Sequence, residues 1–226
     1  MRKQFENKLH NLQSEILKMG QMVEQQLQLA LKALKSLDKD LAQTIVQADN
    51  SINAQRFQIE EKCVQLIATQ QPAARDLRAI VAVMNMIVDL EHMGDQAKDI
   101  AKAILHLAEK AKVPQPDELQ QMGEIAVGML NQVLDAYVEN NPSLAETIAK
   151  QDREVDDLYT FVFSHIIENM VEAKKQKRIL EAYELLRVAQ KLERVGDLAT
   201  NIAERVIYIT TGKLEEINVE PDDNLK

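Results

Sequence analysis

Apolar residues recur at helical spacing along almost the whole chain. Runs in which positions i, i+3, i+4 and i+7 are apolar predict amphipathic helices. Proline fits the first turn of a helix and disrupts its interior, so the first four prolines mark the joints between the runs. Six helices are predicted, at about residues 3–37, 41–69, 73–111, 117–138, 143–172 and 177–211. Gly212 is placed to end the last of them.

These helices are long, at roughly 30 residues against a globular mean of about 11–12. Long amphipathic helices with short joints favour antiparallel bundles. The fold class is therefore predicted to be all-α, with two tandem antiparallel three-helix bundles. The expected domains are residues 1–112, residues 113–212 and a mobile acidic tail over residues 213–226.

The two halves of the chain are related by an internal repeat. Residues 90–101 and 192–203 share the pattern L-E-x-x-G-D-x-A-x-x-I-A, 102 positions apart. An earlier pair of segments, 49–53 and 152–156, matches at an offset of 103. The sequence thus indicates one three-helix unit present in two copies.

Polar residues interrupt the apolar stripe at matching places in both copies. In an antiparallel helix pair, residues equally far from the turn lie at the same height. Asp49 and Asp95 are each 23 residues from Pro72, and Asn53 and Glu91 are each 19 residues from it. The second copy repeats this symmetry. The expected clusters are Asp49, Asn53, Glu91 and Asp95 in the first bundle and Asp152, Asp156, Glu193 and Asp197 in the second.

Oxygen donors without cysteine or histidine are typical of a hard-cation site, which favours magnesium, calcium, manganese or iron over structural zinc. Such an ion would also relieve the repulsion between carboxylates four residues apart. A solvated acidic face that docks a partner explains the same residues, and both interpretations stay open. A di-iron carboxylate enzyme is disfavoured because Gly94 and Gly196 stand where its Glu-x-x-His motif needs histidine.

Composition narrows the class of protein further. The 226 residues include 46% hydrophobic but only 4% aromatic side chains, and six glycines and five prolines, which excludes an all-β fold. A net charge of −9 argues against nucleic-acid binding. The single cysteine, Cys63, fits a reducing cytoplasm, and no run is apolar enough to span a membrane. His92 follows Glu91 directly and points to another side of the helix, so it is a weaker ligand candidate.

Specific motifs give the chain a family resemblance. Residues 71–78 read QPAARDLR and residues 90–95 read LEHMGD, and together they resemble the PhoU family, the accessory regulators of bacterial phosphate transport. Residues 192–197, LERVGD, followed by NIAE at 201–204, look like the second copy of that family's motif. Residues 208–212 are similar to its usual ending.

The resemblance implies two bundles, each carrying an acidic motif pair that can hold a multinuclear metal cluster. Carried over to this chain, the implied ligands are Asp49, Glu91, Asp95, Asp152, Asp156, Glu193 and Asp197. Asn53 departs from the pattern because an acid is expected there, and His92 stands where arginine is usual. The first bundle is therefore expected to bind metal less tightly than the second. The metal could be iron, manganese, magnesium, calcium or zinc.

The family's role implies a cytoplasmic regulator, not an enzyme. It would link the ATPase subunit of the phosphate ABC transporter to a sensor histidine kinase and restrain both, as a homodimer peripheral to the membrane. The alternative is a metal-dependent enzyme or a metal-storage bundle built on the acidic clusters. A third interpretation is a helical scaffold that binds no ligand.

Overall fold

The computed structural model describes residues 2–107, 115–173, 175–214 and 216–217. Within these ranges the chain forms helices and no strand, which confirms the all-α prediction. The helices are α1 (Arg2–Ser36), α2 (Lys39–Gln70), α3 (Ala74–His106), α4 (Asp117–Glu139), α5 (Pro142–Glu172) and α6 (Gln176–Thr211).

Short-range chemistry sets several of the helix ends. The side chain of Asp38 accepts a hydrogen bond from the Leu41 N–H at 3.0 Å and begins α2. Asn141 caps α5 in the same way, with Pro142 in the first turn. Gly212 ends α6 with φ +80°, as the sequence predicts. Because these signals are local, most predicted boundaries lie within two residues of the observed ones.

The end of α3 is the exception. The sequence predicts a helix to residue 111, but α3 ends at His106, and Leu107 has extended backbone angles of φ −68° and ψ 140°. Leu107 is fully buried in the core, so packing turns the chain here. Tertiary packing of this kind leaves no proline or glycine signal in the sequence. Residues 108–111 of the predicted helix lie outside the described residues.

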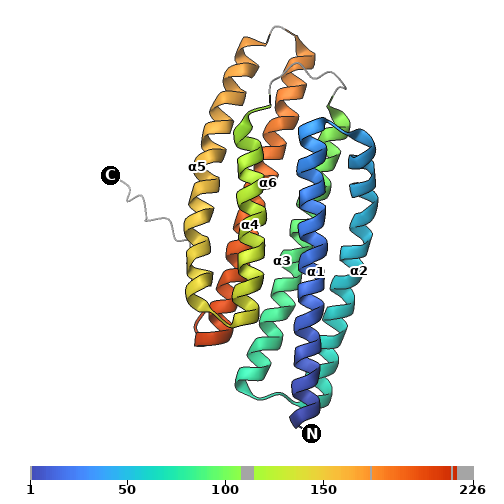
Figure 1. Ribbon diagram of the computed structural model, residues 1–226, viewed down its shortest axis with the longest axis vertical. Coiled ribbons are helices and arrows are strands. Elements are labelled where there is room, and N and C mark those ends of the chain that lie inside the picture. Colours follow the sequence, from blue (N-terminus) through green and yellow to red (C-terminus); the bar gives the residue numbers. More distant parts are fainter. Residues whose placement is uncertain (1, 108–114, 174, 215, 218–226) are drawn as a thin grey trace, which may run out of the picture.

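The helices form two three-helix bundles that lie side by side (Figure 1). Helices α1, α2 and α3 pack on one another, and so do α4, α5 and α6. The bundles meet through α3 against α6 and α1 against α4. The α2–α3 turn and the α5–α6 turn lie at opposite ends of the molecule. Buried apolar side chains of both bundles make one continuous core.

The α1–α4 contact follows the internal repeat. Gly20 on α1 faces the side chain of Leu134 on α4, and Gly123 on α4 faces Leu31 on α1. Gly20 and Gly123 are repeat equivalents, as are Leu31 and Leu134. A leucine of each copy thus packs against the bare backbone of the other copy, which lets the two helices approach closely.

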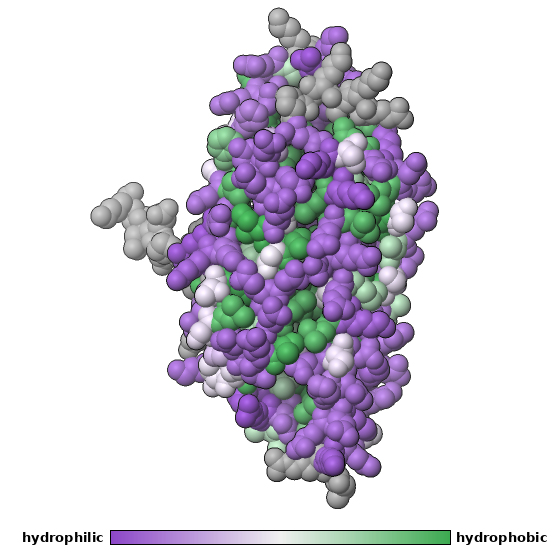
Figure 2. Space-filling view, in the orientation of Figure 1, coloured by the Kyte–Doolittle hydropathy of each residue, from purple (hydrophilic) through white to green (hydrophobic). Residues whose placement is uncertain are grey.

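The predicted domain limits fall largely on residues that the structure does not describe. The expected division between residues 112 and 113 lies outside the described residues, so it stays a prediction. Of the expected tail, Ile217 packs against the core, and its N–H donates to the Glu204 Oε1 at 3.1 Å. Residues 215 and 218–226 of that tail also lie outside the described part. Figure 2 shows a mostly hydrophilic face with scattered apolar side chains between polar rows.

We expect Gly20→Leu to lower the free energy of unfolding by about 1–3 kcal/mol, because a side chain at this position would overpack the α1–α4 contact against Leu134. Denaturant unfolding followed by circular dichroism measures the change. Gly128→Leu on α4 is the matched control, since a Cβ there meets nothing within 4 Å. The control should be neutral or stabilising, because leucine is a better helix former than glycine. Equal losses in both variants would contradict the close-packing explanation.

Candidate functional site

Each bundle has an outer hairpin, α2–α3 or α5–α6, that carries the polar residues singled out from the repeat. Asp49 on α2 and Asp152 on α5 point inward and are almost fully buried, at 2% and 1% exposure. Burying a carboxylate is costly unless positive charge or hydrogen-bond donors compensate. The partners of these two side chains therefore define the chemistry of each bundle.

In the first bundle a lysine joins the two helices. The Lys98 Nζ lies 2.7 Å from the Asp49 Oδ2 and 3.1 Å from the Asp95 Oδ1. The Asn53 side chain donates to the same Asp49 oxygen at 3.3 Å. These contacts with the two carboxylates raise the pKa of Lys98, so the ammonium form is stabilised. Asp49 and Asp95, which are expected at the same height in the hairpin, thus both contact one ammonium group.

Glu91 has cationic neighbours of its own. The Arg56 Nη1 on α2 lies 3.6 Å from the Glu91 Oε1, and the Arg56 guanidinium sits over the ring of Phe57 at 5.2 Å. The His92 Nε2 is 3.7 Å from the Glu91 Oε2 while its side chain remains 45% exposed. His92 therefore interacts locally and does not point into the hairpin, which agrees with its position on the helix.

The second bundle places different groups around its buried carboxylate. The Thr200 Oγ1 on α6 donates to the Asp152 Oδ2 at 3.2 Å. A Cβ on Gly196 would lie only 2.6 Å from the Asp152 Oδ1. The absence of a side chain at Gly196 therefore makes the space that Asp152 occupies against α6. The repeat equivalent Gly94 likewise faces Ile52 on α2, so at both glycines a side chain of the neighbouring helix comes close to the backbone.

The carboxylates of the second bundle repel one another. Burial, together with the negative charges of Asp197, Asp156 and Asp152, raises the pKa of Glu193 to about 7, and the positive charge of Arg194 opposes this rise. Burial also raises the pKa of Asp197, again opposed by Arg194. Asp152, Asp156 and Asp197 are thus all within electrostatic range of Glu193. Raised carboxyl pKa values of this kind are common at functional sites.

A hollow of about 420 Å³ adjoins this cluster. It is lined by Asp152 and Asp197, and also by Glu204 and Glu216, which the sequence reasoning missed. Burial raises the pKa of Glu204, and the hydrogen bond from the Ile217 N–H lowers it. Glu204 lies seven residues, about two helical turns, after Asp197 on α6, and this spacing could have pointed to it. Glu216 lies beyond the helix, where no periodicity predicts its position.

The second bundle has oxygen ligands and space that suit a metal ion. All-oxygen ligands suit a hard cation, and the space at Gly196 admits a carboxylate from α5. In the part of the chain that the structure describes, no three or more His, Cys, Asp and Glu side chains are gathered as a ready metal site. Binding would therefore require side chains in the second bundle to rotate toward a shared ion. The metal assignments and the metal itself stay predictions.

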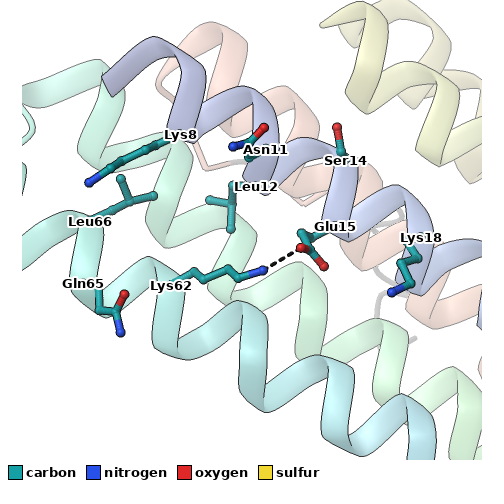
Figure 3. A pocket seen from close by; sticks show the side chains of 9 residues that line it. All are labelled: Lys8, Asn11, Leu12, Ser14, Glu15, Lys18, Lys62, Gln65 and Leu66. Atoms are coloured by element: carbon teal, nitrogen blue, oxygen red, sulfur yellow. Dashed lines mark hydrogen bonds and ion pairs between the residues drawn. The ribbon is translucent and has the colours of Figure 1, made fainter. Parts of the chain in front are cut away.

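Another hollow lies away from both clusters, between α1 and α2. Figure 3 shows its lining, in which the Lys62 side chain reaches Glu15 while Lys8 points away from it. The Lys62 Nζ lies 2.5 Å from the Glu15 Oε1, and the Gln55 side chain donates to the other Glu15 oxygen at 2.6 Å. These hydrogen bonds lower the pKa of Glu15. Lys62 of this hollow is thus already paired with a carboxylate from the chain itself.

The contact between α3 and α6 lies between the two outer hairpins. The Lys191 Nζ is 2.9 Å from the Asp99 Oδ2, and Lys102 pairs with the other Asp99 oxygen at 3.0 Å. Burial raises the pKa of Asp89 to about 6 against the opposing effect of Arg205. Because α3 and α6 each supply half of one polar cluster, this contact fixes the two clusters relative to each other.

A duplicated three-helix bundle with a polar cluster on each outer hairpin defines an all-helical tandem-repeat protein. The family model described as the PhoU domain matches the chain twice, at residues 16–104 and 119–206. The chain therefore belongs to the PhoU family, which confirms the resemblance that its motifs indicate.

Individual relatives match over nearly the full length. The chain is 39% identical over 218 residues to the phosphate-specific transport system accessory protein PhoU homolog of Clostridium acetobutylicum, covering 96% of this chain and 99% of that protein. The Streptococcus pneumoniae homolog is 38% identical, with 96% and 100% covered.

Solved structures agree with this match. The crystal structure of the phosphate transport system regulatory protein PhoU from Streptococcus pneumoniae superposes with a TM-score of 0.87 at 36% identity, covering 93% of this chain and 99% of that one. The crystal structure of PhoU from Pseudomonas aeruginosa gives the same TM-score at 34% identity, with 92% and 100% covered. The fold is thus shared along the whole chain and not in one bundle alone.

The raised pKa of Glu193 makes stability depend on pH. The unfolded chain loses this proton near pH 4.5, whereas the folded protein keeps it to about pH 7. Glu193 therefore lowers the free energy of unfolding as pH rises between these values. In EDTA at pH 8, Glu193→Gln should be more stable than the parent by on the order of 1 kcal/mol, after allowance for solvent screening.

Urea unfolding at pH 5 and pH 8 measures this difference. Glu168→Gln, on the exposed side of α5, is the matched control and should show the same pH profile as the parent. A Glu193→Gln profile parallel to that of the parent would contradict the repulsion inferred among the carboxylates.

Proposed function

We propose that this protein is a non-enzymatic regulator that restrains phosphate uptake and phosphate-starvation signalling. The observation that carries the proposal is the match over nearly the full chain to PhoU relatives described as accessory proteins of phosphate-specific transport. The architecture supports it, since long helical faces around one continuous core suit a docking scaffold.

The proposed mode of action is contact with two partners. The protein would bind the ATPase subunit of the phosphate ABC transporter and a sensor histidine kinase, as a homodimer. Exposed apolar side chains suit such contacts, and they are frequent near the α5–α6 turn. That group is Phe161, Phe163, Ile167, Val171, Ile179, Leu180 and Tyr183. The acidic cluster farther along the same hairpin would favour a basic partner surface.

The proposed location is the cytoplasmic face of the membrane. Among the described residues no helix combines the length and the apolar character needed to span a bilayer. The partners would therefore supply the membrane attachment, and the protein would associate peripherally.

Deletion of the gene in the host should derepress phosphate-starvation genes in phosphate-rich medium, because the restraint on the kinase is lost. A promoter fusion to a starvation gene measures this, and expression of the parent chain should restore repression. Unchanged reporter activity in the deletion strain would contradict the regulatory role.

The partners can be tested with the same strains. Affinity purification from cells grown in high and low phosphate should recover the transporter ATPase or the kinase, identified by mass spectrometry. A variant with Ile167→Glu and Tyr183→Glu places charges on the exposed apolar side of the hairpin and should lose partners while remaining folded. Full recovery with this variant would exclude that surface.

Metal binding in the second bundle is the second part of the proposal. The raised pKa values of Glu193 and Asp197 support it, because a cation would stabilise the ionised carboxylates. Asp152, Asp156, Glu193 and Asp197 are the proposed ligands. When bound, the ion would neutralise this surface and alter its charge toward partners, while the chain's own residues hold and orient the carboxylates.

We expect the full-length parent to retain a divalent ion such as Mn²⁺ after dialysis, and Glu193→Gln/Asp197→Asn to lose it. The matched variant Glu91→Gln/Asp95→Asn removes the equivalent acids of the first bundle and should keep the ion. Elemental analysis measures the content. Equal or zero content in all three proteins would remove the proposal, and metal-dependent hydrolysis of a phosphorylated substrate, lost in Asp197→Ala, would favour an enzyme.

A further inference from the structure

Besides Asn53, the two polar clusters differ at two further positions that the repeat makes equivalent. Lys98 on α3 corresponds to Thr200 on α6, 102 positions later. Arg56 on α2 corresponds to Tyr159 on α5, 103 positions later. The first bundle therefore has cationic side chains where the second has a hydroxyl group and an aromatic ring.

Lys98 reaches across the hairpin and does not extend into solvent. Its side chain is 26% exposed, and its Nζ contacts Asp49 on α2 as well as Asp95 one turn back on α3. The carboxylate of Asp49 is 3% exposed, so the ammonium group meets a buried negative charge. The other Asp49 oxygen, Oδ1, is buried and makes no hydrogen bond. Lys98 thus compensates the Asp49 carboxylate through only one of its two oxygens.

We propose that Lys98 is a built-in cation that takes the place of a metal ion in the first bundle. Its ammonium group is tethered to α3 and lies between the carboxylates that would otherwise share an ion. A divalent cation could bind between Asp49 and Asp95 only by displacing the Lys98 Nζ, because two positive groups would repel each other in the space between these carboxylates. The inference rests on the proposed function in one respect, since it takes the metal binding proposed for the equivalent cluster of the second bundle as the alternative to Lys98.

The neighbouring lysine provides a matched comparison. Lys102 lies one turn farther along α3 and pairs with Asp99 at 3.0 Å, with the same i, i+3 spacing that Lys98 has to Asp95. Asp99 is also bound by Lys191 from α6, so it keeps a cation when Lys102 is removed. Asp49 has no second cation among the ion pairs of the described residues. Removal of Lys98 should therefore create a demand for an external ion, and removal of Lys102 should not.

The test uses full-length chains in which the second cluster is disabled by Glu193→Gln/Asp197→Asn. Lys98→Thr, which installs the residue present at position 200, and Lys102→Thr are each added to this background. Thermal unfolding is followed with EDTA or with MnCl₂, and bound manganese is counted after desalting.

The Lys98→Thr protein should have a lower Tm than its background in EDTA and recover about 5 °C or more with Mn²⁺, with about one ion retained. The background and Lys102→Thr proteins should show neither effect. Adding Asn53→Asp should strengthen the response, because it restores a fourth carboxylate. If Lys98→Thr does not fold, Lys98→Gln keeps an N–H donor on a flexible side chain while removing the charge, and it should respond to Mn²⁺ in the same direction.

The outcomes separate the two ideas. No Mn²⁺ response in either Lys98 variant, with or without the added Asn53→Asp substitution, overturns the built-in cation. Rescue of Lys98→Thr and Lys102→Thr to the same extent overturns it as well. A parent chain without Mn²⁺ binding refutes the second-bundle site alone, since the Lys98 variants are read in a background that lacks that site.

Discussion

A carboxylate held between packed helices must be compensated by a positive charge, a hydrogen-bond donor or a proton, and the outer hairpins are organised around this need. Asp49 and Asp152 occupy equivalent inward positions. Lys98 compensates the first, and the Thr200 hydroxyl group together with the space at Gly196 accommodates the second. The proton that Glu193 keeps to about pH 7 is a further response to the same crowding of negative charge.

Much of the fold could be predicted because its signals are local. Helical periodicity, proline and the caps at Asp38 and Asn141 place most boundaries, and equal distances from a turn place residues of two helices at one height. The end of α3 could not be predicted, because it depends on the burial of Leu107 in a core assembled from distant segments. Sequence alone cannot show which side chains surround a given position in three dimensions.

The same distinction applies to the candidate site. The acidic positions could be found from the repeat, but their partners depend on how long side chains cross between helices. Lys98 stands three residues after Asp95, which was a visible signal, yet its contact with Asp49 depends on the observed spacing of α2 and α3. The hollow with Glu204 and Glu216 depends on how the chain turns after Gly212.

The reciprocal contact of Gly20 with Leu134 and Gly123 with Leu31 resembles the self-complementary interface of a two-fold dimer. In a dimer of identical subunits, a substitution in one subunit also appears in the other, so the equivalent sites of the two subunits must have the same residues. Joining the two copies in one polypeptide removes that restriction while the reciprocal packing is kept. Each half of the chain can therefore have its own ion chemistry, and a lysine in one half need not be matched by a lysine in the other.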